Sequence, residues 1–254
     1  YFSCTGQRWG NPLYRWECHR QTDYAWWVQR LRHSMSLYDV LRIDHFRAFA
    51  DYWEITAESE TALNGHWVTG PGVQFFDAIK RQLGPLPLIA EDLGILSAAA
   101  IQLRDQLKIP GLRILLFAFD TDDPHSPFLP QNFIENCVAY TGTHDNNTAT
   151  GAFDSANVDA NGISVGRRRR QILRKYLPKE YEFLPLHEGL LRWLCGSAAQ
   201  WIIYPMQDVL ALGREARLNT PGVPLGNWEW KLCTEQLEGK VRFFLQQLAK
   251  REGV

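Results

Sequence analysis

Apolar positions along the chain recur with two periods, and together they predict an α/β fold. Spacings of three to four residues are typical of helices, and short apolar runs are typical of buried strands. The predicted helices cover 24–38, 73–83, 96–107, 167–176, 187–194 and 234–250. The predicted strands cover 40–46, 87–90, 113–119 and 201–204, and a further strand lies within 133–141. Short apolar strands that alternate with helices indicate parallel strands joined by crossover helices.

The beginning of the chain has a different composition. Residues 1–23 are rich in Gly, Pro, Asn and aromatic residues, which predicts a long shaped loop. Asp23 follows it and can cap the helix that begins next.

Five parallel strands allow two architectures. They can form an open sheet, or they can be the later part of an eight-stranded barrel whose first strands lie elsewhere. A complete (β/α)8 barrel fits in ~250 residues. In this chain of 254 residues, however, the pattern shows only five strand–helix units, which are joined by long connections.

Composition and charge exclude several classes of protein. With 45% apolar and 22% charged residues, the chain is not disordered. Its 27 basic and 28 acidic residues give no electrostatic reason to expect nucleic acid or an acidic membrane as a partner. No apolar run reaches the ~18 residues of a membrane span. We therefore expect neither nucleic acid nor a membrane as a partner.

The cysteines are five in number, scattered, and without a CxxC motif. This pattern indicates free thiols in a reducing compartment. Neither a zinc-ligand spacing nor a Gly-rich phosphate loop occurs, so the sequence predicts no metal and no cofactor.

The first candidate site is the run Leu41 to Phe46, where charges interrupt an apolar strand. Side chains alternate along a strand, so Arg42 and Asp44 share one face while Leu41 and Ile43 share the other. A guanidinium beside a carboxyl group favours its ionised form, which suits a nucleophile. The alternative is a structural ion pair.

The second candidate is the pair Glu91 and Asp92, which follows an apolar strand and precedes a turn. A carboxyl group among apolar neighbours can stay protonated and act as a general acid. For Asp92, capping of the next helix is the simpler explanation, so Glu91 is the better candidate.

The third candidate is the polar run Thr141 to Thr148, directly after another apolar strand. Asn, Asp and Gly also form turns, but His144 and Asp145 at a strand end suit a polar ligand. Catalytic residues of barrels lie at the C-terminal ends of strands. Two carboxylates are the minimum for glycosidic-bond chemistry, and ten tryptophans can stack on sugars.

Three motifs resemble signature regions of the α-amylase clan of glycoside hydrolases, and their flanks resemble the amylomaltase family of 4-α-glucanotransferases. The clan motifs are RIDHF (42–46), AEDLG (90–94) and GTHDN (142–146). The flanks are TGQRWGNPLYRWE (5–17), NGHWVTGPG (64–72), FLPQNF (128–133), EARLNTPG (215–222) and GNWEW (226–230). The resemblance covers nearly the whole chain.

The resemblance implies a (β/α)8 TIM barrel, of which this chain holds roughly strands 4 to 8. Residues 1–254 would then be the C-terminal part of the catalytic barrel, with residues 1–23 as a substrate-covering loop. It implies a retaining mechanism in which Asp44 is the nucleophile, Glu91 the general acid/base and Asp145 the transition-state stabiliser. The implied substrate-binding residues are Arg42, His144, Phe2, Gln7, Trp9, Asp120 and Asn219.

The implied activity is transfer of α-1,4-glucan segments to glucose or maltodextrin acceptors. Hydrolysis of α-glucans and a non-catalytic glucan-binding half-enzyme are the alternatives. Starch-type glucans are the expected partners, together with the missing N-terminal strands from the same or a complementing chain. The expected location is the cytoplasm, or the plastid stroma in a plant or alga.

The chain departs from the family pattern at three places: Ala48 replaces a usual Gly, Asn147 a usual Asp, and Ile55-Thr56 an expected Ile-Pro. None of these changes removes a catalytic carboxylate. Without its first strands a barrel cannot close, and an open strand edge favours association. The run Arg167 to Arg170 is interpreted as a solvated helix face.

Overall fold

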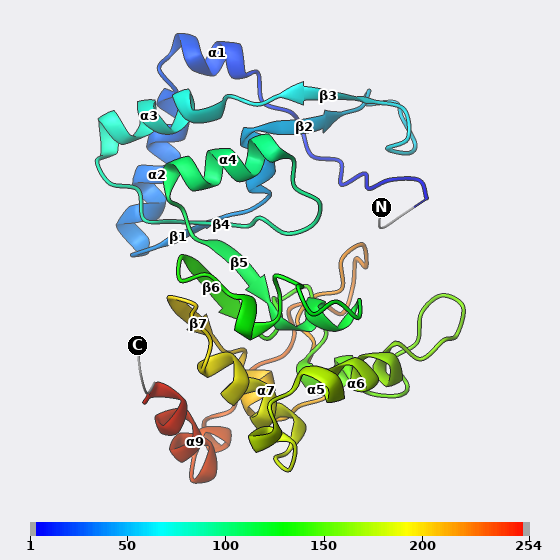
Figure 1. Ribbon diagram of the computed structural model, residues 1–254. Helices are drawn as coiled ribbons and strands as arrows, with labels where there is room; N and C mark the ends of the chain where they lie inside the picture. The colour runs from blue at the N-terminus through cyan, green and yellow to red at the C-terminus, as the bar shows by residue number, and fades with distance from the viewer. Residues whose placement is uncertain (1–3, 251–254) are drawn as a thin grey trace. The chain divides into compact units, whose positions relative to one another are not determined.

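The computed structural model describes residues 4–250, which form two compact units divided between Leu112 and Arg113 (Figure 1). Each unit is described by itself. Among residues 4–250, no helix is both long and apolar enough to cross a membrane.

Unit 1 combines parallel strands with helices, as the apolar pattern predicts. Its elements are α1 (Trp16–Gln21), α2 (Ala25–Leu37), β1 (Leu41–Ile43), a 3-10 helix (Phe46–Phe49), β2 (Asp51–Glu54), β3 (His66–Thr69), α3 (Gly72–Leu83), β4 (Leu88–Ala90), α4 (Ala98–Leu107) and the start of β5 (Gly111–Ile114). Strand β4 lies between β1 and β5 and is parallel to both. In the register, Leu41 pairs with Leu88 and Ala90 pairs with Gly111.

Aromatic side chains form the core of unit 1. Trp27 of α2 packs edge-on against Phe75 of α3, with ring centroids 5.3 Å apart. Leu41 and Ile43 of β1 pack against the same core. Because side chains alternate along a strand, Arg42 between them lies on the opposite face of β1.

Two predictions at the start of the chain are wrong. A short helix, α1, lies within the predicted loop of residues 1–23. Asp23 does not cap α2: Tyr24 occupies the cap position with a left-handed backbone (φ 58°), and no side chain caps the helix. The Asp23 side chain instead accepts hydrogen bonds from Arg81 and Gln82 of α3.

The antiparallel hairpin of β2 and β3 is not predicted by the sequence. Asp51 pairs with Thr69 and Glu54 with His66. Both strands have only four residues and carry exposed tryptophans, so no apolar alternation marks them.

Unit 2 is built around the parallel pair β6 (Cys137–Tyr140) and β7 (Trp201–Ile203). Its helices are α5 (Ala149–Ala152), α6 (Val165–Tyr176), α7 (Leu186–Cys195), α8 (Met206–Val209) and α9 (Lys240–Ala249), and its 3-10 helices are Leu115–Phe119, Pro130–Asn132, Lys179–Tyr181, Arg214–Ala216 and Thr234–Leu237. The apolar side of α7 buries Leu190, Leu191 and Leu194.

Two predicted elements of this part of the chain differ in the structure. The predicted strand 113–119 ends at Ile114, and Leu115–Phe119 is a 3-10 helix. A continuously buried apolar run does not distinguish strand from helix by its period. The predicted helix 234–250 begins only at Lys240, because Gly239 (φ 59°, ψ −117°) interrupts it with a backbone that other residues rarely adopt.

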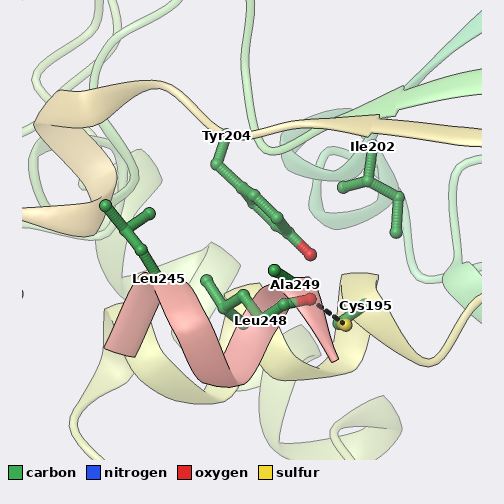
Figure 2. A pocket seen from close by; sticks show the side chains of 6 residues that line it. All are labelled: Cys195, Ile202, Tyr204, Leu245, Leu248 and Ala249. Carbon is green, nitrogen blue, oxygen red and sulfur yellow. Dashed lines mark hydrogen bonds between the residues drawn. The ribbon is translucent and has the colours of Figure 1, made fainter. Parts of the chain in front are cut away.

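Helix α9 closes unit 2 over an apolar cavity of about 340 Å³ beside α7 and β7 (Figure 2). Ile202, Leu245 and Leu248 line it, and the Cys195 thiol donates to the Leu248 carbonyl at 3.4 Å. Phe244 and Leu248 of α9 are buried against Leu191. We attribute this cavity to the packing of α9.

Candidate active site

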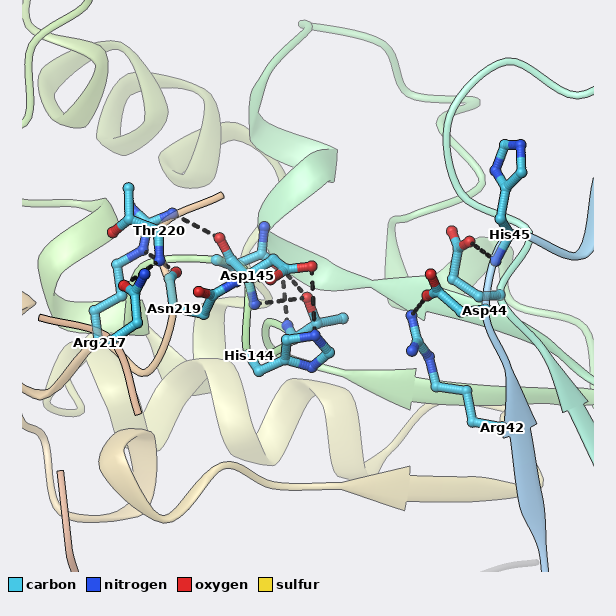
Figure 3. Close-up of polar contacts among 12 residues, drawn as sticks. Arg42, Asp44, His45, His144, Asp145, Arg217, Asn219 and Thr220 are labelled. Atoms are coloured by element: carbon cyan, nitrogen blue, oxygen red, sulfur yellow. Dashed lines mark hydrogen bonds and ion pairs between the residues drawn. The ribbon is translucent and has the colours of Figure 1, made fainter. Parts of the chain in front are cut away.

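The end of β1 presents Arg42 and Asp44 on the face opposite the core. The Arg42 guanidinium pairs with Asp44 Oδ1 at 2.8 Å, and the Asp44 side chain is 76% exposed (Figure 3). Exposed ion pairs stabilise a fold by at most about 1 kcal/mol. Stability therefore does not account for a charge in β1 and a second one in the turn directly after it, which favours the interpretation of Asp44 as a nucleophile oriented by Arg42.

The turn that follows Asp44 wraps around Glu91 at the end of the neighbouring strand. His45 adopts a left-handed backbone (φ 47°), and its N–H donates to Glu91 Oε2 at 2.7 Å. The Phe46 N–H donates to the Glu91 carbonyl at 3.0 Å. A left-handed residue other than Gly costs about 1 kcal/mol or more, and such strain is concentrated at functional sites.

The Glu91 carboxyl group is fixed through both oxygens. Besides the His45 contact, the Leu93 N–H donates to Oε1 at 2.9 Å. The sequence predicted apolar surroundings for the Glu91 carboxyl group. In the structure it instead accepts hydrogen bonds from backbone N–H groups of the residues that follow β1 and β4. The result is a carboxyl group of defined orientation at the end of β4, the strand that pairs with β1.

Asp92 has a structural role, but the predicted one is wrong. Ser97, not Asp92, caps α4 by accepting the Ala100 N–H at 3.2 Å. The Asp92 side chain is 1% exposed, forms an ion pair with Arg104 and accepts the Leu112 N–H at 2.7 Å. It therefore joins β4, α4 and β5.

Asp145 follows β6 in unit 2 and is held by two polar side chains (Figure 3). The Asn219 amide donates to Asp145 Oδ1 at 2.6 Å, and His144 Nε2 lies 3.4 Å from Oδ2. The Asn219 N–H also donates to the His144 carbonyl at 3.1 Å. Three residues that the sequence singled out are thus brought together in unit 2.

Two further residues of this site were not singled out, although both lie in motifs that carry the resemblance. Arg217 donates to the Asp145 carbonyl at 2.6 Å and to the Asn219 carbonyl at 2.8 Å. Burial lowers the pKa of Arg217, and the Asp145 carboxylate opposes this change. The Trp228 ring lies on His144, with centroids 5.2 Å apart.

Asp208 contacts both ends of the polar run Thr141 to Thr148. No pattern in the sequence singles out Asp208 for this role. Its carboxylate accepts the Thr141 hydroxyl at the end of β6 and the Ala149 N–H, at 2.6 Å, at the start of α5. Burial raises the pKa of Asp208, while the hydroxyl and the amide act in the opposite direction.

A polar cavity of about 220 Å³ adjoins Asp145 within unit 2. Besides Asp145, its polar lining consists of Asn146, Asn147, Asn157, Arg169 and Arg217. Asn147, where the resemblance leads us to expect Asp, is thus one of the residues that line this cavity.

Arg169 contacts a predicted substrate-binding residue. It donates to Asp120 Oδ1 from Nε at 3.0 Å and from Nη2 at 2.6 Å, and its side chain is only 14% exposed. Arg170 donates to the Phe153 carbonyl at 2.7 Å. The interpretation of Arg167 to Arg170 as a solvated face is therefore wrong for Arg169, whereas Arg167, Arg168 and Arg170 are exposed.

The predicted cover loop is described only in part. Gln7 and Trp9 are exposed residues of unit 1, whereas Phe2 lies outside the described residues. Among residues 4–250, no group of three or more His, Cys, Asp or Glu side chains is arranged to hold a metal ion.

Comparison with known proteins places these residues in one family. The sequence profile of the 4-alpha-glucanotransferase family matches residues 1–236. The chain belongs to this family. Its members include 4-alpha-glucanotransferases from Thermus thermophilus, 42% identical over 93% of this chain and 47% of the relative, and from Streptococcus pneumoniae, 45% identical over 93% and 45%. The chain thus spans about half the length of these family members.

Solved structures of amylomaltases have a similar fold. The amylomaltase from Streptococcus agalactiae in complex with acarbose matches with a TM-score of 0.88 and 37% identity, over 98% of this chain and 48% of that one. This confirms the predicted α/β fold class and its assignment to part of a TIM-barrel amylomaltase. The Corynebacterium glutamicum amylomaltase, at 18% identity and a TM-score of 0.70 over 90% of this chain and 38% of that one, shares the fold.

Proposed function

We propose that this chain carries the catalytic residues of a 4-α-glucanotransferase, which moves α-1,4-glucan segments to glucose or maltodextrin acceptors with retention of configuration. One observation carries the proposal. In the turn after β1, the exposed Asp44 is paired with Arg42. The backbone N–H of the next residue, His45, donates a hydrogen bond to the carboxyl group of Glu91.

The first step is formation of a covalent ester. Asp44 attacks the anomeric carbon while Glu91 gives its proton to the departing glycosidic oxygen, so the leaving glucan is released with a free hydroxyl group. Arg42 orients Asp44 through their ion pair. A retaining mechanism predicts a separation of ~5–5.5 Å between the two carboxyl groups.

The second step reverses the first with a different alcohol. Glu91, now ionised, takes the proton of an acceptor sugar hydroxyl, whose oxygen attacks the anomeric carbon and releases Asp44. Two inversions restore the α configuration. Transfer in place of hydrolysis requires that water be kept from the ester, and the loop with Gln7 and Trp9 is the proposed cover.

Asp145 is proposed to stabilise the positive charge that develops on the sugar in both steps. Its carboxylate is oriented by Asn219 and lies beside His144. A preorganised negative group at the reacting carbon needs little reorganisation during the reaction. His144 and Asp120 are proposed to contact sugar hydroxyls.

The proposed substrates are maltodextrins and starch-type glucans. The amylomaltase from Streptococcus agalactiae, a structural relative, was solved with acarbose. We place the protein in the cytoplasm, or in the plastid stroma of a plant or alga. None of its five cysteines, all of them among the described residues, is in a disulfide, which supports a reducing compartment. The proposed partner is the N-terminal part of the barrel, from the same or a complementing chain.

The test is incubation with maltotriose, using material whose intact mass has been measured. The chain is assayed alone and as a chimera in which it replaces the matching stretch of the Thermus thermophilus relative. Disproportionation yields glucose together with maltodextrins longer than maltotriose. Products no larger than the substrate would instead show a hydrolase. Turnover by the chimera but not by the isolated chain would show a half-enzyme.

Substitutions identify the groups that act. Asp44→Asn and Glu91→Gln should each reduce transfer by at least a thousandfold while the circular dichroism spectrum is retained. Asp77→Asn, which changes an exposed acid of α3, is the matched control and should leave the rate unchanged. Equal rates for all three variants would contradict the assignment.

A further inference from the structure

The loop that carries Gln7 and Trp9 is attached to a second loop of unit 1. We call residues 5–10 the cover loop and residues 55–65, between β2 and β3, the hairpin loop. The Ala62 N–H donates to the Thr5 carbonyl at 3.0 Å, and the Arg8 guanidinium donates to the Ala57 carbonyl at 3.1 Å. These two contacts join the loops on either side of Gln7.

Gly6 allows the two loops to approach closely. Its backbone is left-handed (φ +72°), and a Cβ built on it would lie 2.8 Å from the Ala62 Cβ and 3.3 Å from the Ala62 carbonyl carbon. Real Cβ atoms do not come this close to another carbon, so any larger residue at position 6 must separate the loops. Ala62 is itself buried.

The hairpin loop is in turn fixed to its own strands. The Trp53 indole N–H donates to the Ala62 carbonyl at 2.9 Å, and Trp53 packs against Trp67 across the hairpin with ring centroids 5.3 Å apart. Arg47 lies over the Trp67 ring at 3.9 Å and also donates to the Ile95 carbonyl at 2.6 Å. The cover loop is therefore linked to the segments that follow Asp44 and Glu91.

The cover loop combines a fixed backbone with free side-chain surface. Gln7 is exposed and Trp9 is 59% exposed, although the residues around them are bound to the hairpin loop. A ligand that contacts these side chains thus meets a loop that is already ordered, and ordering before binding raises affinity.

We propose that the hairpin loop sets the position of Gln7 and Trp9 for the acceptor sugar, and that Gly6 and Arg8 are the positioning residues of this contact. The inference rests on the proposed transferase function, in which an acceptor must displace water from the covalent ester. It assigns to the β2–β3 hairpin a role in the choice between acceptor sugar and water.

The first test measures attachment of the loop without using activity. Trypsin cleaves after Arg8 only when the surrounding backbone is free, so the Gly6→Ala variant should be cut between Arg8 and Trp9 at least fivefold faster than the parent protein. Gly10→Ala is the matched control, because Gly10 has a similar backbone (φ +70°) but nothing within 4 Å of its Cβ position. Equal cleavage of the two variants would refute the proposal.

The second test measures acceptor use in the form of the protein that disproportionates maltotriose. Gly6→Ala and Arg8→Ala should raise KM for glucose as acceptor about tenfold and increase hydrolysis relative to transfer, while kcat at saturating glucose changes less than twofold. Arg8→Lys retains one donor and should restore much of the affinity. Arg32→Ala, at an exposed position of α2, is the control.

The outcomes separate the two proposals. If neither the isolated chain nor the chimera lengthens maltotriose, the proposed function fails. If the parent disproportionates but Gly6→Ala and Arg8→Ala leave KM for glucose and the hydrolysis ratio unchanged, the function stands and the role of the hairpin is refuted.

Discussion

The Asn219 amide donates a hydrogen bond to the Asp145 carboxylate and so helps to orient it, together with the neighbouring His144. Asn219→Ala removes the donor and should lower kcat by about tenfold to a hundredfold, within the range for a lost preorganised contact. Asn219→Asp places a second negative charge at 2.6 Å and should lower kcat further. Maltotriose kinetics at neutral pH provide the measurement. Similar rates for the parent and Asn219→Asp would show that Asp145 is not held in this way during the reaction.

Asp208 gives the fold a specific pH dependence. Burial raises its pKa above the ordinary value of 3.8, so in the intervening pH range the folded state holds a proton that the unfolded state has released. The free energy of unfolding contributed by this group therefore falls as pH rises from 3.8 to the folded pKa, and is constant above it. Asp208→Asn should remove this fall.

Urea unfolding at pH values from 4 to 8 measures that difference between the parent protein and Asp208→Asn. Asp159→Asn, at an exposed turn, is the control and should follow the parent curve. Parallel curves for the parent and Asp208→Asn would contradict the burial argument.

The proposed catalytic carboxylates Asp44 and Glu91 could be singled out from the sequence because each directly follows an apolar strand, and Asp145 because it lies in the polar run after another. Their supporting residues could not. Arg217 reaches Asp145 across 72 positions and Asp208 reaches Thr141 across 67. No local pattern marks such contacts, since they depend on which segments the fold brings together.

At the scale of elements, the junction of β4, α4 and β5 leaves no room for a side chain at Gly111. A Cβ at that position would overlap the Asp92 carboxylate, which is buried and paired with Arg104. Displacing one partner of a buried ion pair costs about 3–5 kcal/mol. Gly111→Ala should therefore lower the free energy of unfolding by about 3 kcal/mol or more.

Chemical denaturation measures this change. Gly196→Ala is the control, because a Cβ there would make ordinary contacts at 3.8 Å and should alter stability by less than about 0.5 kcal/mol. An equally small change for Gly111→Ala would mean that Asp92 can move without losing its partners.

Helices were predicted well where one apolar face is long enough to show its period, as in α3. The β2–β3 hairpin was missed because Trp53 and Trp67 pair across it on an exposed face, with no alternation to reveal a strand. The 3-10 helix Leu115–Phe119 was missed because it is buried on nearly every side.

At the scale of the whole molecule, the edge of β7 limits how the isolated chain behaves. Strand β7 pairs with β6, and no strand within residues 4–250 pairs with its other side, while Trp201 and Ile203 are exposed along it. Exposed apolar edge strands template association. We expect the isolated chain to self-associate at micromolar concentrations, and Ile203→Lys to reduce this by several-fold in sedimentation velocity.

Phe183→Lys provides the comparison, because Phe183 is more exposed but lies in no strand. If both variants reduced association equally, general surface hydrophobicity and not the edge of β7 would be responsible. The alternation of apolar strands and helices predicted the α/β class, and the resemblance to the family predicted an incomplete barrel with an open strand edge.

The buried contact of Asp92 with Leu112 also bears on the order in which unit 1 acquires its structure. It closes a loop of 20 positions, whereas the N–H of His45 reaches Glu91 across 46. Each doubling of loop length adds about 0.6 kcal/mol of closure entropy. During refolding, pulsed hydrogen exchange should therefore find the amide of Leu112 protected before the amides of Leu41 and His45. The β4–α4–β5 segment would then form first, and β1, the strand before Asp44, would pair with β4 afterwards.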